Sequence, residues 1–324
     1  MTAVLKALTR EQFNRYHEDG GLAPLQALSQ EEVVRYRGCL EQFERDAGMP
    51  IMKHPARPTI WAKPHLLFTW VDKIVRNPAI LDVVEDIIGP NIRVFHTNIF
   101  VKEPHSPEFI SWHQDGAYNA ISPPEVFTTW VALSDATPEM GCMRMLKGSH
   151  KRGLRIHADI KTAHNLLSRG QRIDALEDVD IVDLALRAGE MSIHHSFAVH
   201  SSEPNRSSQR RIGVMTTYVP THCRYIGTGP ARFRAALVRG HDEHHHFDDD
   251  PQPAVDFGIA EQMAHHQSCE RYIANVTSSQ NKQLATACLM QDAAMRPCTM
   301  AARADRVSAS LAGRTANTRR GSIA

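Results

Sequence analysis

Residues 92–115, IRVFHTNIFVKEPHSPEFISWHQD, mark the point at which helical sequence gives way to extended sequence. Within 92–103 the side chains alternate in character, which is typical of a strand with two different faces. One face is apolar or β-branched, and we expect it to pack on a helix or a second sheet; it carries Phe95, Thr97, Ile99 and Val101. The other face is more polar, and we expect it to line a pocket; it carries Val94, His96, Asn98, Phe100 and Lys102.

Further β-rich runs follow this one, separated by turn residues. They cover 108–115, 125–135, 141–150, 190–202 and 210–220. Short runs bounded by Gly, Pro, Asn and Ser predict an antiparallel sandwich or barrel. Segment 151–188 is more polar, and we expect a partly helical insertion that covers one end of the sandwich.

The first ninety residues have a helical pattern. Segment 29–47 opens with Ser29 as an expected N-cap and Glu32 three residues later, the spacing of a capping box. Segment 65–88 is a second helical region. Its last helix is expected to begin at Pro78 and to end at Gly89-Pro90.

These patterns predict one domain over 1–277. Its parts are a helical portion (1–90), a β core (91–222) and a closing helix (255–276). Beyond Ile273 the chain contains no aromatic residue, and after Pro297 it is mostly Ala, Ser, Thr and Arg. Such a composition buries too little apolar surface to offset its ordering entropy, so 278–324 is expected to be a disordered basic tail.

Overall charge and cysteine content exclude several classes of protein. The 324 residues include 37 Lys and Arg against 36 Asp and Glu, a net formal charge of +1, which argues against nucleic-acid binding through bulk charge. No apolar run approaches the ~18 residues needed to cross a bilayer, and charge comes too early for a signal peptide. The six cysteines form no C-x-x-C pair, which favours free thiols in a reducing cytoplasm. The sequence gives no prediction of oligomeric state.

The segment Ser111-Trp112-His113-Gln114-Asp115 carries a candidate metal site. Residues i and i+2 of a strand point to the same face, so His113 and Asp115 would lie side by side. His200, at the end of a later β run, is the candidate third ligand. Two histidines and one carboxylate form the facial triad of non-haem iron(II) oxygenases, which leaves three metal positions open. Taken alone, His113 is better explained as a hydrogen-bonded core histidine.

Eleven residues after His200, Arg211 opens the run RIGVMTTYV. A guanidinium there could pair in a two-pronged manner with a carboxylate of 2-oxoglutarate. Ser202 points the same way as His200 and could donate to the same carboxylate. Arg210 must face the opposite side of the strand, where we expect a surface salt bridge.

Four stretches together resemble the phytanoyl-CoA dioxygenase family of Fe(II)/2-oxoglutarate enzymes, nearest its bacterial branch of natural-product hydroxylases and chlorinating enzymes. They are SWHQD, TTWVALSDATPEMGCMRMLKGSH, LRAGEMSIHHSFAVHSSEPNRSSQRRIGV and TYVPTH, and the resemblance extends over roughly 10–275. It implies a double-stranded β-helix (jelly-roll) core with N-terminal helices packed on one side. It also implies a set of site residues: His113, Asp115 and His200 as iron ligands, Arg211 and Ser202 as the 2-oxoglutarate pair, and Trp130 as an aromatic wall of that pocket.

The resemblance further implies the type of chemistry. In the related halogenases the aspartate is replaced by Ala or Gly and chloride takes the vacated position, whereas Asp115 keeps its carboxylate. We therefore expect hydroxylation, with Fe(II), 2-oxoglutarate and O2 giving succinate and CO2 as coproducts. The substrate is expected to be a small metabolite, derived from an amino acid or tethered to a carrier, rather than a nucleic acid or a membrane.

Several residues are candidates for the substrate or cosubstrate pocket, each with an alternative. Asn98 and His96 line it unless 92–103 is a solvent-facing edge strand. Tyr118 and Asn119 contact substrate or hold the 116–125 loop. Arg144 suits an anionic substrate, with a surface position favoured.

Other polar residues are expected to have surface or packing roles rather than roles in the site. Lys102 is expected at the surface, and His194 and His195 are expected mainly to pack, with one of them able to reach the pocket. The run His244-His245-His246 could suggest a metal site, but consecutive residues do not converge on one ion from a regular element.

Two other functions remain open at this stage. One is a non-catalytic jelly-roll binding module with a degenerate metal site, because sandwiches of this kind host many functions. The other keeps the metal site but gives desaturation, epimerisation, cyclisation or halogenation. The joint presence of His113, Asp115, His200 and Arg211 favours an active oxygenase.

Overall fold

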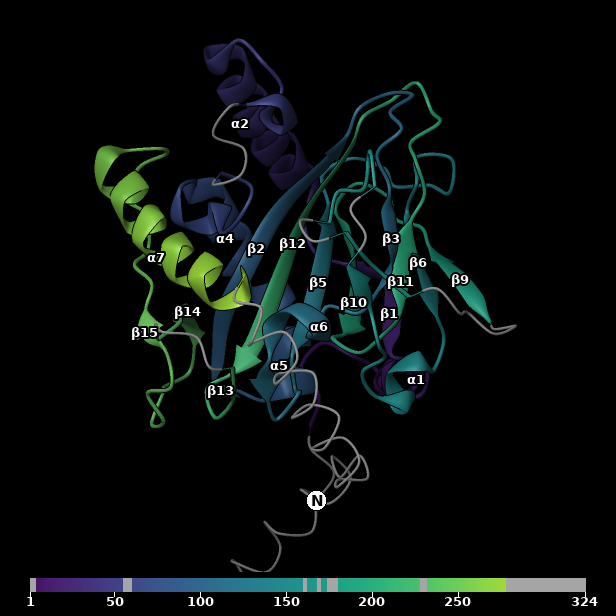
Figure 1. Cartoon of the computed structure of the whole chain (residues 1–324), viewed down its shortest axis with the longest axis vertical. Helices are drawn as coiled ribbons and strands as arrows, with labels where there is room; N and C mark the ends of the chain where they lie inside the picture. Colours follow the sequence, from purple (N-terminus) through teal and green to yellow (C-terminus); the bar gives the residue numbers. More distant parts are fainter. Residues whose placement is uncertain are drawn as a thin grey trace, which may run out of the picture.

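Two sheets face each other in the computed structural model, which describes residues 4–54, 60–159, 162–167, 170–173, 180–227 and 232–277 (Figure 1). Seven strands form the larger sheet, in the order β1-β10-β5-β12-β2-β14-β15, and four form the smaller one, in the order β3-β11-β6-β9. All pairs are antiparallel except β14 with β15. This is the expected double-stranded β-helix, or jelly roll.

The larger sheet is built around two long central strands. Its members are β1 (Gly21–Gln26), β2 (Ile92–Lys102), β5 (Phe127–Ala132), β10 (Glu190–His195), β12 (Arg211–Pro220), β14 (Arg234–Arg239) and β15 (Asp248–Asp249). β2 and β12 pair along their whole lengths, with one register shift near Tyr218. Every residue of β2 is buried, because helices cover one face of this sheet and the smaller sheet covers the other.

The smaller sheet carries the shorter strands. They are β3 (Ile110–His113), β6 (Met143–Leu146), β9 (Ile181–Leu184) and β11 (His200–Ser202). β4 (Ile121–Ser122) pairs with β13 (Arg224–Tyr225), and β7 (Ala158–Asp159) pairs with β8 (Gln171–Arg172). β11 lies between β3 and β6, so its register is fixed from both sides.

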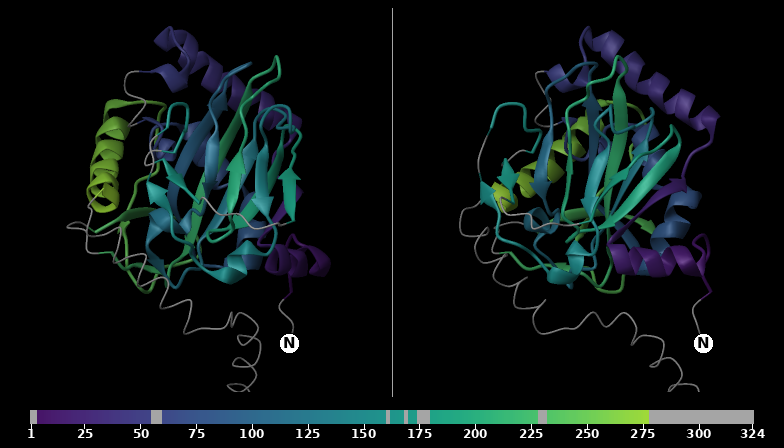
Figure 2. Two further views of the ribbon diagram at one scale, coloured as in Figure 1. Left: turned by 45° about the vertical axis from the view of Figure 1, so that its right-hand side comes forward. Right: turned by 90° about the vertical axis from the view of Figure 1, so that its right-hand side faces the viewer.

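Helices from the first ninety residues lie along the outer side of the larger sheet (Figure 2). They are α1 (Arg10–Asp19), α2 (Gln30–Ala47), α4 (Thr69–Val75) and α5 (Pro78–Ile88), with short 3-10 turns η1 (Ile51–Lys53) and η2 (Pro64–Leu66). Ser29 and Glu32 form the expected capping box of α2. Asn77 caps α5, which begins at Pro78 and ends at Gly89 as predicted.

The main hydrophobic core joins these helices to the larger sheet. Leu40, Val71 and Val84 from the helices belong to the same buried cluster as Ile99 and Val101 of β2. Ile99 and Val101 of the predicted apolar face therefore pack on helices, as expected. The face assignment is wrong at the start of the strand, where the register shift opposite Phe95 puts Val94 in the main core and Phe95 in a second cluster with Phe233 and Phe247. The other helices of the described residues are η3 (Ser149–Arg152), α6 (Gly116–Asn119) and α7 (Ile259–Thr277), the last of which contacts β14 and η2.

Three parts of the fold differ from the sequence-based expectation. Residues 21–26, in the region expected to be helical, form strand β1 at the edge of the larger sheet. The run 190–202 is not one strand but two, and β10 and β11 belong to different sheets. In the described residues of 151–188, the expected partly helical insertion has short strands β7, β8 and β9, and its helical part is limited to the end of η3.

The proposed tail, 278–324, lies outside the described residues. Within the described ranges, none of the helices is both long enough and apolar enough to span a membrane.

One packing constraint links the fold to the pocket between the sheets. A Cβ atom placed on Gly213 would overlap the indole ring of Trp130 from the neighbouring strand. We expect Gly213→Ala to lower the free energy of unfolding by about 1–3 kcal/mol, as overpacking of a core does. Urea denaturation measures this change.

Gly38 of α2 is the matched control, since no atom lies within 4 Å of its added Cβ. Gly38→Ala should raise the free energy of unfolding by up to about 1 kcal/mol through helix propensity. Equal effects of the two substitutions would show that Trp130 does not constrain position 213.

Candidate metal centre

His113 and Asp115 reach the interior from the end of a strand rather than from its middle. β3 ends at His113, and Asp115 has helical backbone angles (φ −60°, ψ −34°) at the start of α6. The expected alternation along one strand is therefore wrong in detail. The two side chains still converge, because the backbone turns immediately after His113.

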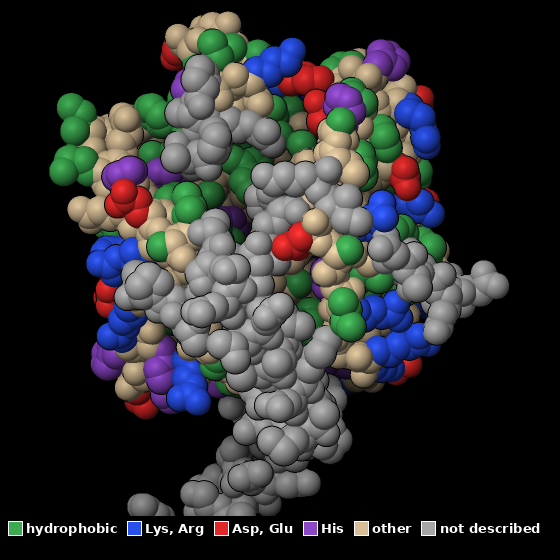
Figure 3. All heavy atoms as spheres, in the orientation of Figure 1, with side chains coloured by type: hydrophobic (Ala, Val, Ile, Leu, Met, Phe, Trp, Pro, Cys, Tyr) green, Lys and Arg blue, Asp and Glu red, His purple; other side chains and the backbone are tan. Residues whose placement is uncertain are grey.

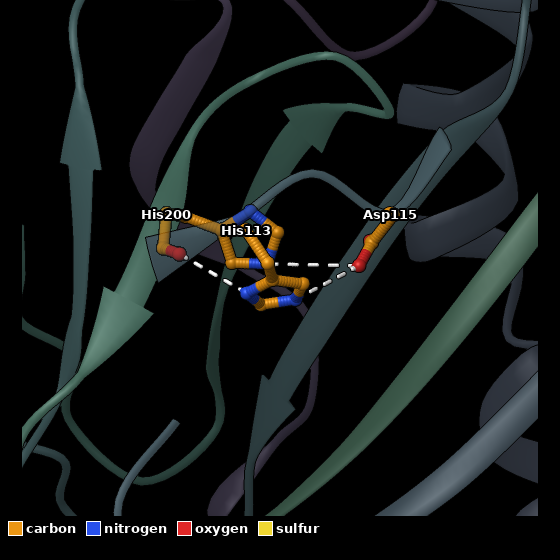
Figure 4. Close-up of side chains that lie close together, drawn as sticks. All are labelled: His113, Asp115 and His200. Carbon is orange, nitrogen blue, oxygen red and sulfur yellow. Dashed lines mark hydrogen bonds and ion pairs between the residues drawn. The ribbon is translucent and has the colours of Figure 1, made fainter. Parts of the chain in front are cut away.

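His200 arrives from the neighbouring strand. β11 and β3 are antiparallel, and His200 lies directly opposite His113 in the register. The Nε2 atoms of His113 and His200 are 3.4 Å and 3.7 Å from Asp115 Oδ1 (Figure 4). One ligand atom from each of the three residues lies within 4.8 Å of the other two, so a single ion can contact all of them.

Backbone carbonyls fix the tautomers of both histidines. His113 Nδ1 lies 2.9 Å from Ser111 O and 3.1 Å from His200 O, and His200 Nδ1 lies 3.0 Å from Ala198 O. A carbonyl only accepts, so each Nδ1 carries the hydrogen and each Nε2 keeps its lone pair. Such outer hydrogen bonds typically orient metal-binding histidines.

The local electrostatics keep this donor set in its metal-binding protonation state. Burial alone would raise the pKa of Asp115, but His200, His113 and His194 hold that pKa well below its usual value. Burial, together with His113 and His194, holds the pKa of His200 well below the ordinary value for histidine. The carboxylate is thus ionised and His200 is neutral, as metal ligands must be.

Two buried cations lie side by side near the triad, and one of them, Arg211, lines the same cavity. Arg211 and Lys102 are opposite each other on β12 and β2, and their exposed fractions are 3% and 1%. Among the described residues, neither has a carboxylate within ion-pairing distance. The Lys102 ammonium donates to Ser202 Oγ (2.7 Å) and Glu203 O, and the Arg211 guanidinium lies 4.3 Å from the centre of the Trp130 ring.

Burying two like charges side by side is costly, and the pKa values reflect this cost. Burial lowers the pKa of Arg211 to about 10, and burial with the Arg211 charge lowers the pKa of Lys102 to about 6. An anion bound between them would offset the cost. The expectation that Lys102 is a surface charge is wrong, although its place on the polar face of 92–103 was a signal for burial.

A pocket of about 750 Å³ is lined by Arg211 and by the three residues of the triad. Lys102 is not among its lining residues, although its hydrogen-bond partner Ser202 is. His96, Asn98, Trp130, Tyr118 and Asn119 line it as expected, along with Ser202. Tyr272 of α7 also lines it and stacks on His96, with ring centres 4.6 Å apart. The amide nitrogen of Asn98 donates to Trp61 O.

Other predicted residues lie elsewhere. Arg144 is not among the pocket-lining residues and pairs with Glu203 and Asp183, so the surface alternative holds for it. Arg210 pairs with Glu44 and Glu103, as expected for the outward-facing arginine.

The clustered histidines also separate clearly. His194 lines the pocket and contacts Asp115 Oδ2, whereas the adjacent His195 does not line it and its Nδ1 accepts from the backbone N–H of Phe197. His194 is the residue whose role the sequence analysis missed; the only signal was that one of the pair must face inward. His244 and His245 are exposed, and their backbone amides donate to Asp242, with no convergence on an ion.

Charge on the visible surface is mixed. On the coloured part of the face in Figure 3, basic and acidic side chains are interspersed, in keeping with the net charge of +1. A single-sign patch that would recruit a polyanion is not seen on that part of the described surface.

Comparison with known proteins gives consistent results. The model of the phytanoyl-CoA dioxygenase (PhyH) family matches residues 16–213. The chain is 31% identical over 157 residues to a probable alpha-ketoglutarate-dependent hypophosphite dioxygenase of Stutzerimonas stutzeri, covering 48% of this chain and 54% of that protein. It is 27% identical over 238 residues to the peroxisomal phytanoyl-CoA dioxygenase of Rattus norvegicus, covering 68% and 70%.

A solved structure extends the match to most of the chain. The non-heme monooxygenase ThoJ, in its apo form, superposes with a TM-score of 0.69 and 28% sequence identity, covering 87% of this chain and 99% of that one.

A jelly roll with a His-x-Asp and a distant His on facing positions defines the class of non-haem iron, 2-oxoglutarate-dependent oxygenases. This chain belongs to the phytanoyl-CoA dioxygenase family. The expectation of Fe(II), 2-oxoglutarate and O2 is thereby confirmed at the level of the family.

The triad makes a direct prediction about metal binding. His113→Ala, Asp115→Ala and His200→Ala should each weaken binding of Co(II), used as a probe for Fe(II), by more than the ~10–100-fold typical of an outer-shell change. Anaerobic titration followed by visible absorption measures the affinity.

His244→Ala and His245→Ala serve as histidine controls outside the pocket and should leave the affinity unchanged. If they weakened Co(II) binding as much as His113→Ala does, the metal site would be misplaced.

Proposed function

We propose that the protein is an Fe(II)- and 2-oxoglutarate-dependent dioxygenase that hydroxylates an unactivated C–H bond of a small metabolite. One observation carries this proposal: a complete two-histidine, one-carboxylate set lines the same pocket as Arg211, which forms with the adjacent Lys102 a buried cationic pair that has no carboxylate partner among the described residues. The first group suits a ferrous ion, and the second suits the far carboxylate of a keto-diacid.

In this assignment, His113, Asp115 and His200 hold the iron. The mixed N/O set suits a redox-active metal and leaves half of an octahedron free. Arg211 binds the far carboxylate of 2-oxoglutarate, and Lys102 contributes positive charge from beside it while donating to the hydroxyl of Ser202. Trp130 forms the flat wall behind the guanidinium. Bound iron, 2-oxoglutarate and O2 would supply the oxidising power, while the protein positions them in the pocket.

Hydroxylation is favoured over halogenation by Asp115. Its carboxylate fills the position at which the related halogenases would bind chloride, and the lowered pKa of Asp115 keeps this carboxylate charged. Desaturation, epimerisation and cyclisation share the same metal site, and they are the alternative outcomes that product analysis separates.

The pocket supports a small-molecule substrate. Its wall combines aromatic residues such as Trp61, Tyr118 and Tyr272 with the amide of Asn119, and its volume of about 750 Å³ exceeds what a keto-diacid alone would fill. The natural-product branch of the resemblance makes a secondary metabolite, free or carrier-tethered, our proposed substrate. The curated relatives are named for smaller and larger substrates, hypophosphite and phytanoyl-CoA.

The decisive experiment measures succinate released from 2-oxoglutarate by anaerobically iron-loaded protein after aeration, with and without candidate metabolites. Substrate-dependent succinate with a product heavier by one oxygen atom is the expected result. A protein that binds iron and 2-oxoglutarate but never forms succinate would instead be a jelly-roll binding module.

The two cations give a second prediction. Arg211→Ala should weaken the binding free energy of 2-oxoglutarate by about 2–4 kcal/mol, because it removes a buried charged partner. This change raises the dissociation constant roughly 30- to 1000-fold. Isothermal titration against the anaerobic Co(II) protein measures this. Arg210→Ala, a neighbouring arginine outside the pocket, is the control and should change the constant little; an equal loss would point to a general structural effect.

Lys102 gives the same interaction a pH dependence. Its pKa of about 6 means that the side chain is neutral above that pH in the cosubstrate-free protein. An anion bound at the adjacent Arg211 favours the protonated form of Lys102, so affinity for 2-oxoglutarate should fall by up to about tenfold per pH unit above pH 6 and level off below it. Lys102→Met should remove this slope; a slope that persists in the variant would assign the proton to another group.

A further inference from the structure

The second oxygen of Asp115 is held by two residues of the opposite sheet. Thr128 Oγ1 donates to Oδ2 at 3.1 Å, and His194 Nε2 lies 3.1 Å from the same atom. Thr128 and His194 are cross-strand partners on β5 and β10, so a single pair of adjacent residues in the larger sheet contacts the carboxylate. Both side chains are essentially inaccessible to solvent.

These contacts fix the state of His194. A carboxylate is an acceptor, so the hydrogen of His194 must be on Nε2. Its Nδ1 atom is buried and has no hydrogen-bond partner among the described residues, which is the expected condition of the bare nitrogen in that tautomer. Since Nε2 faces Oδ2 rather than Oδ1, His194 is placed as a donor to the carboxylate.

The two carboxylate oxygens consequently have different tasks. Oδ2 accepts from Thr128 and His194, whereas Oδ1 is the oxygen that faces the Nε2 atoms of His113 and His200. Carboxylates bind metals through one oxygen or through both. With Oδ2 occupied by two donors, only Oδ1 is presented to the metal.

We propose that His194, with Thr128, is a positioning residue that restricts Asp115 to one-oxygen coordination and so preserves the open metal positions. This inference rests on the proposed metal site of His113, Asp115 and His200. If Oδ2 were free to rotate toward the ion, it would take a position that the two-pronged cosubstrate or O2 needs. The pair of donors prevents this rotation from outside the coordination sphere.

Metal binding tests the inference without turnover. His194→Leu removes the donor at similar volume, whereas His194→Gln retains an N–H donor with comparable reach. Against the wild type, His194→Leu should weaken Co(II) binding by about 10–100-fold and alter the visible d–d spectrum, as loss of an outer-shell partner does. The Co(II) affinity of His194→Gln should remain within about threefold of the wild-type affinity, a difference that small changes in packing explain. Thr128→Val and Thr128→Ser form a second pair of variants. Thr128→Val, which lacks the hydroxyl, should weaken Co(II) binding, and Thr128→Ser, which keeps it, should not.

A double-substitution cycle separates positioning from other roles. If His194 acts through Asp115, then adding His194→Leu to Asp115→Ala should cause no further loss of Co(II) affinity. If His194→Leu lowered Co(II) affinity as much in the Asp115→Ala variant as it does in the wild type, the inference would be overturned. His194 would then bind the metal itself or support the fold. Unchanged affinity and spectrum in both His194→Leu and Thr128→Val would also overturn it.

The cycle distinguishes this inference from the function on which it rests. Wild-type protein that fails to bind Co(II), or His113→Ala protein that binds as tightly as wild type, would reject the metal site and the inference with it. Normal wild-type binding that depends on His113 but not on His194 would reject the inference alone. Urea denaturation of each variant identifies any that are unfolded, and the Thr128 pair then replaces the His194 pair.

Discussion

The pairing of β11 with β3 is the interaction on which the site depends. It places His200 opposite His113, with ring centres 4.2 Å apart, although the two residues are 87 positions apart in the chain. A slip of one residue would turn His200 to the other face of the sheet, since side chains alternate along a strand. Pairing of β11 with β6 on its other side prevents that slip. The metal site is thus a consequence of sheet register.

The larger sheet provides the complementary half of the site. Its central strands bring Lys102 and Arg211 together as cross-strand partners, an arrangement that is unfavourable for two buried cations without an anion. Extensive packing offsets the free-energy cost of burying these two cations. β2 and β12 pair over ten register positions, and their other faces join the helical core. A fold with less buried surface behind these strands could not keep two such charges out of water.

Much of this arrangement could be predicted from sequence, because its signals are local. The capping box of α2, the start of α5 at Pro78 and the β-rich runs each follow from residues close together in the chain. The alternation of 92–103 placed His96 and Asn98 on one face, and both line the pocket. The motif resemblance brought together His113, Asp115 and His200, which spacing alone could not do.

The missed features all depend on distant contacts. β1 contains glycine and proline, which are poor strand formers, and it becomes a strand only by pairing with β10. Lys102 was expected at the surface because lysine is rarely buried without a partner. Its burial follows from Arg211 and Ser202, which arrive from other strands.

His194 shows how the two sheets act as one site. Its strand belongs to the larger sheet, yet its nitrogen contacts a carboxylate that follows the last residue of β3 in the smaller sheet. The separation between the sheets therefore determines whether Oδ2 of Asp115 is held, and side chains packed between them, such as Trp130 and Phe100, maintain that separation. Because Trp130 also lies against Arg211, a residue of the packed layer between the sheets is at the same time a wall of the pocket beside the buried guanidinium.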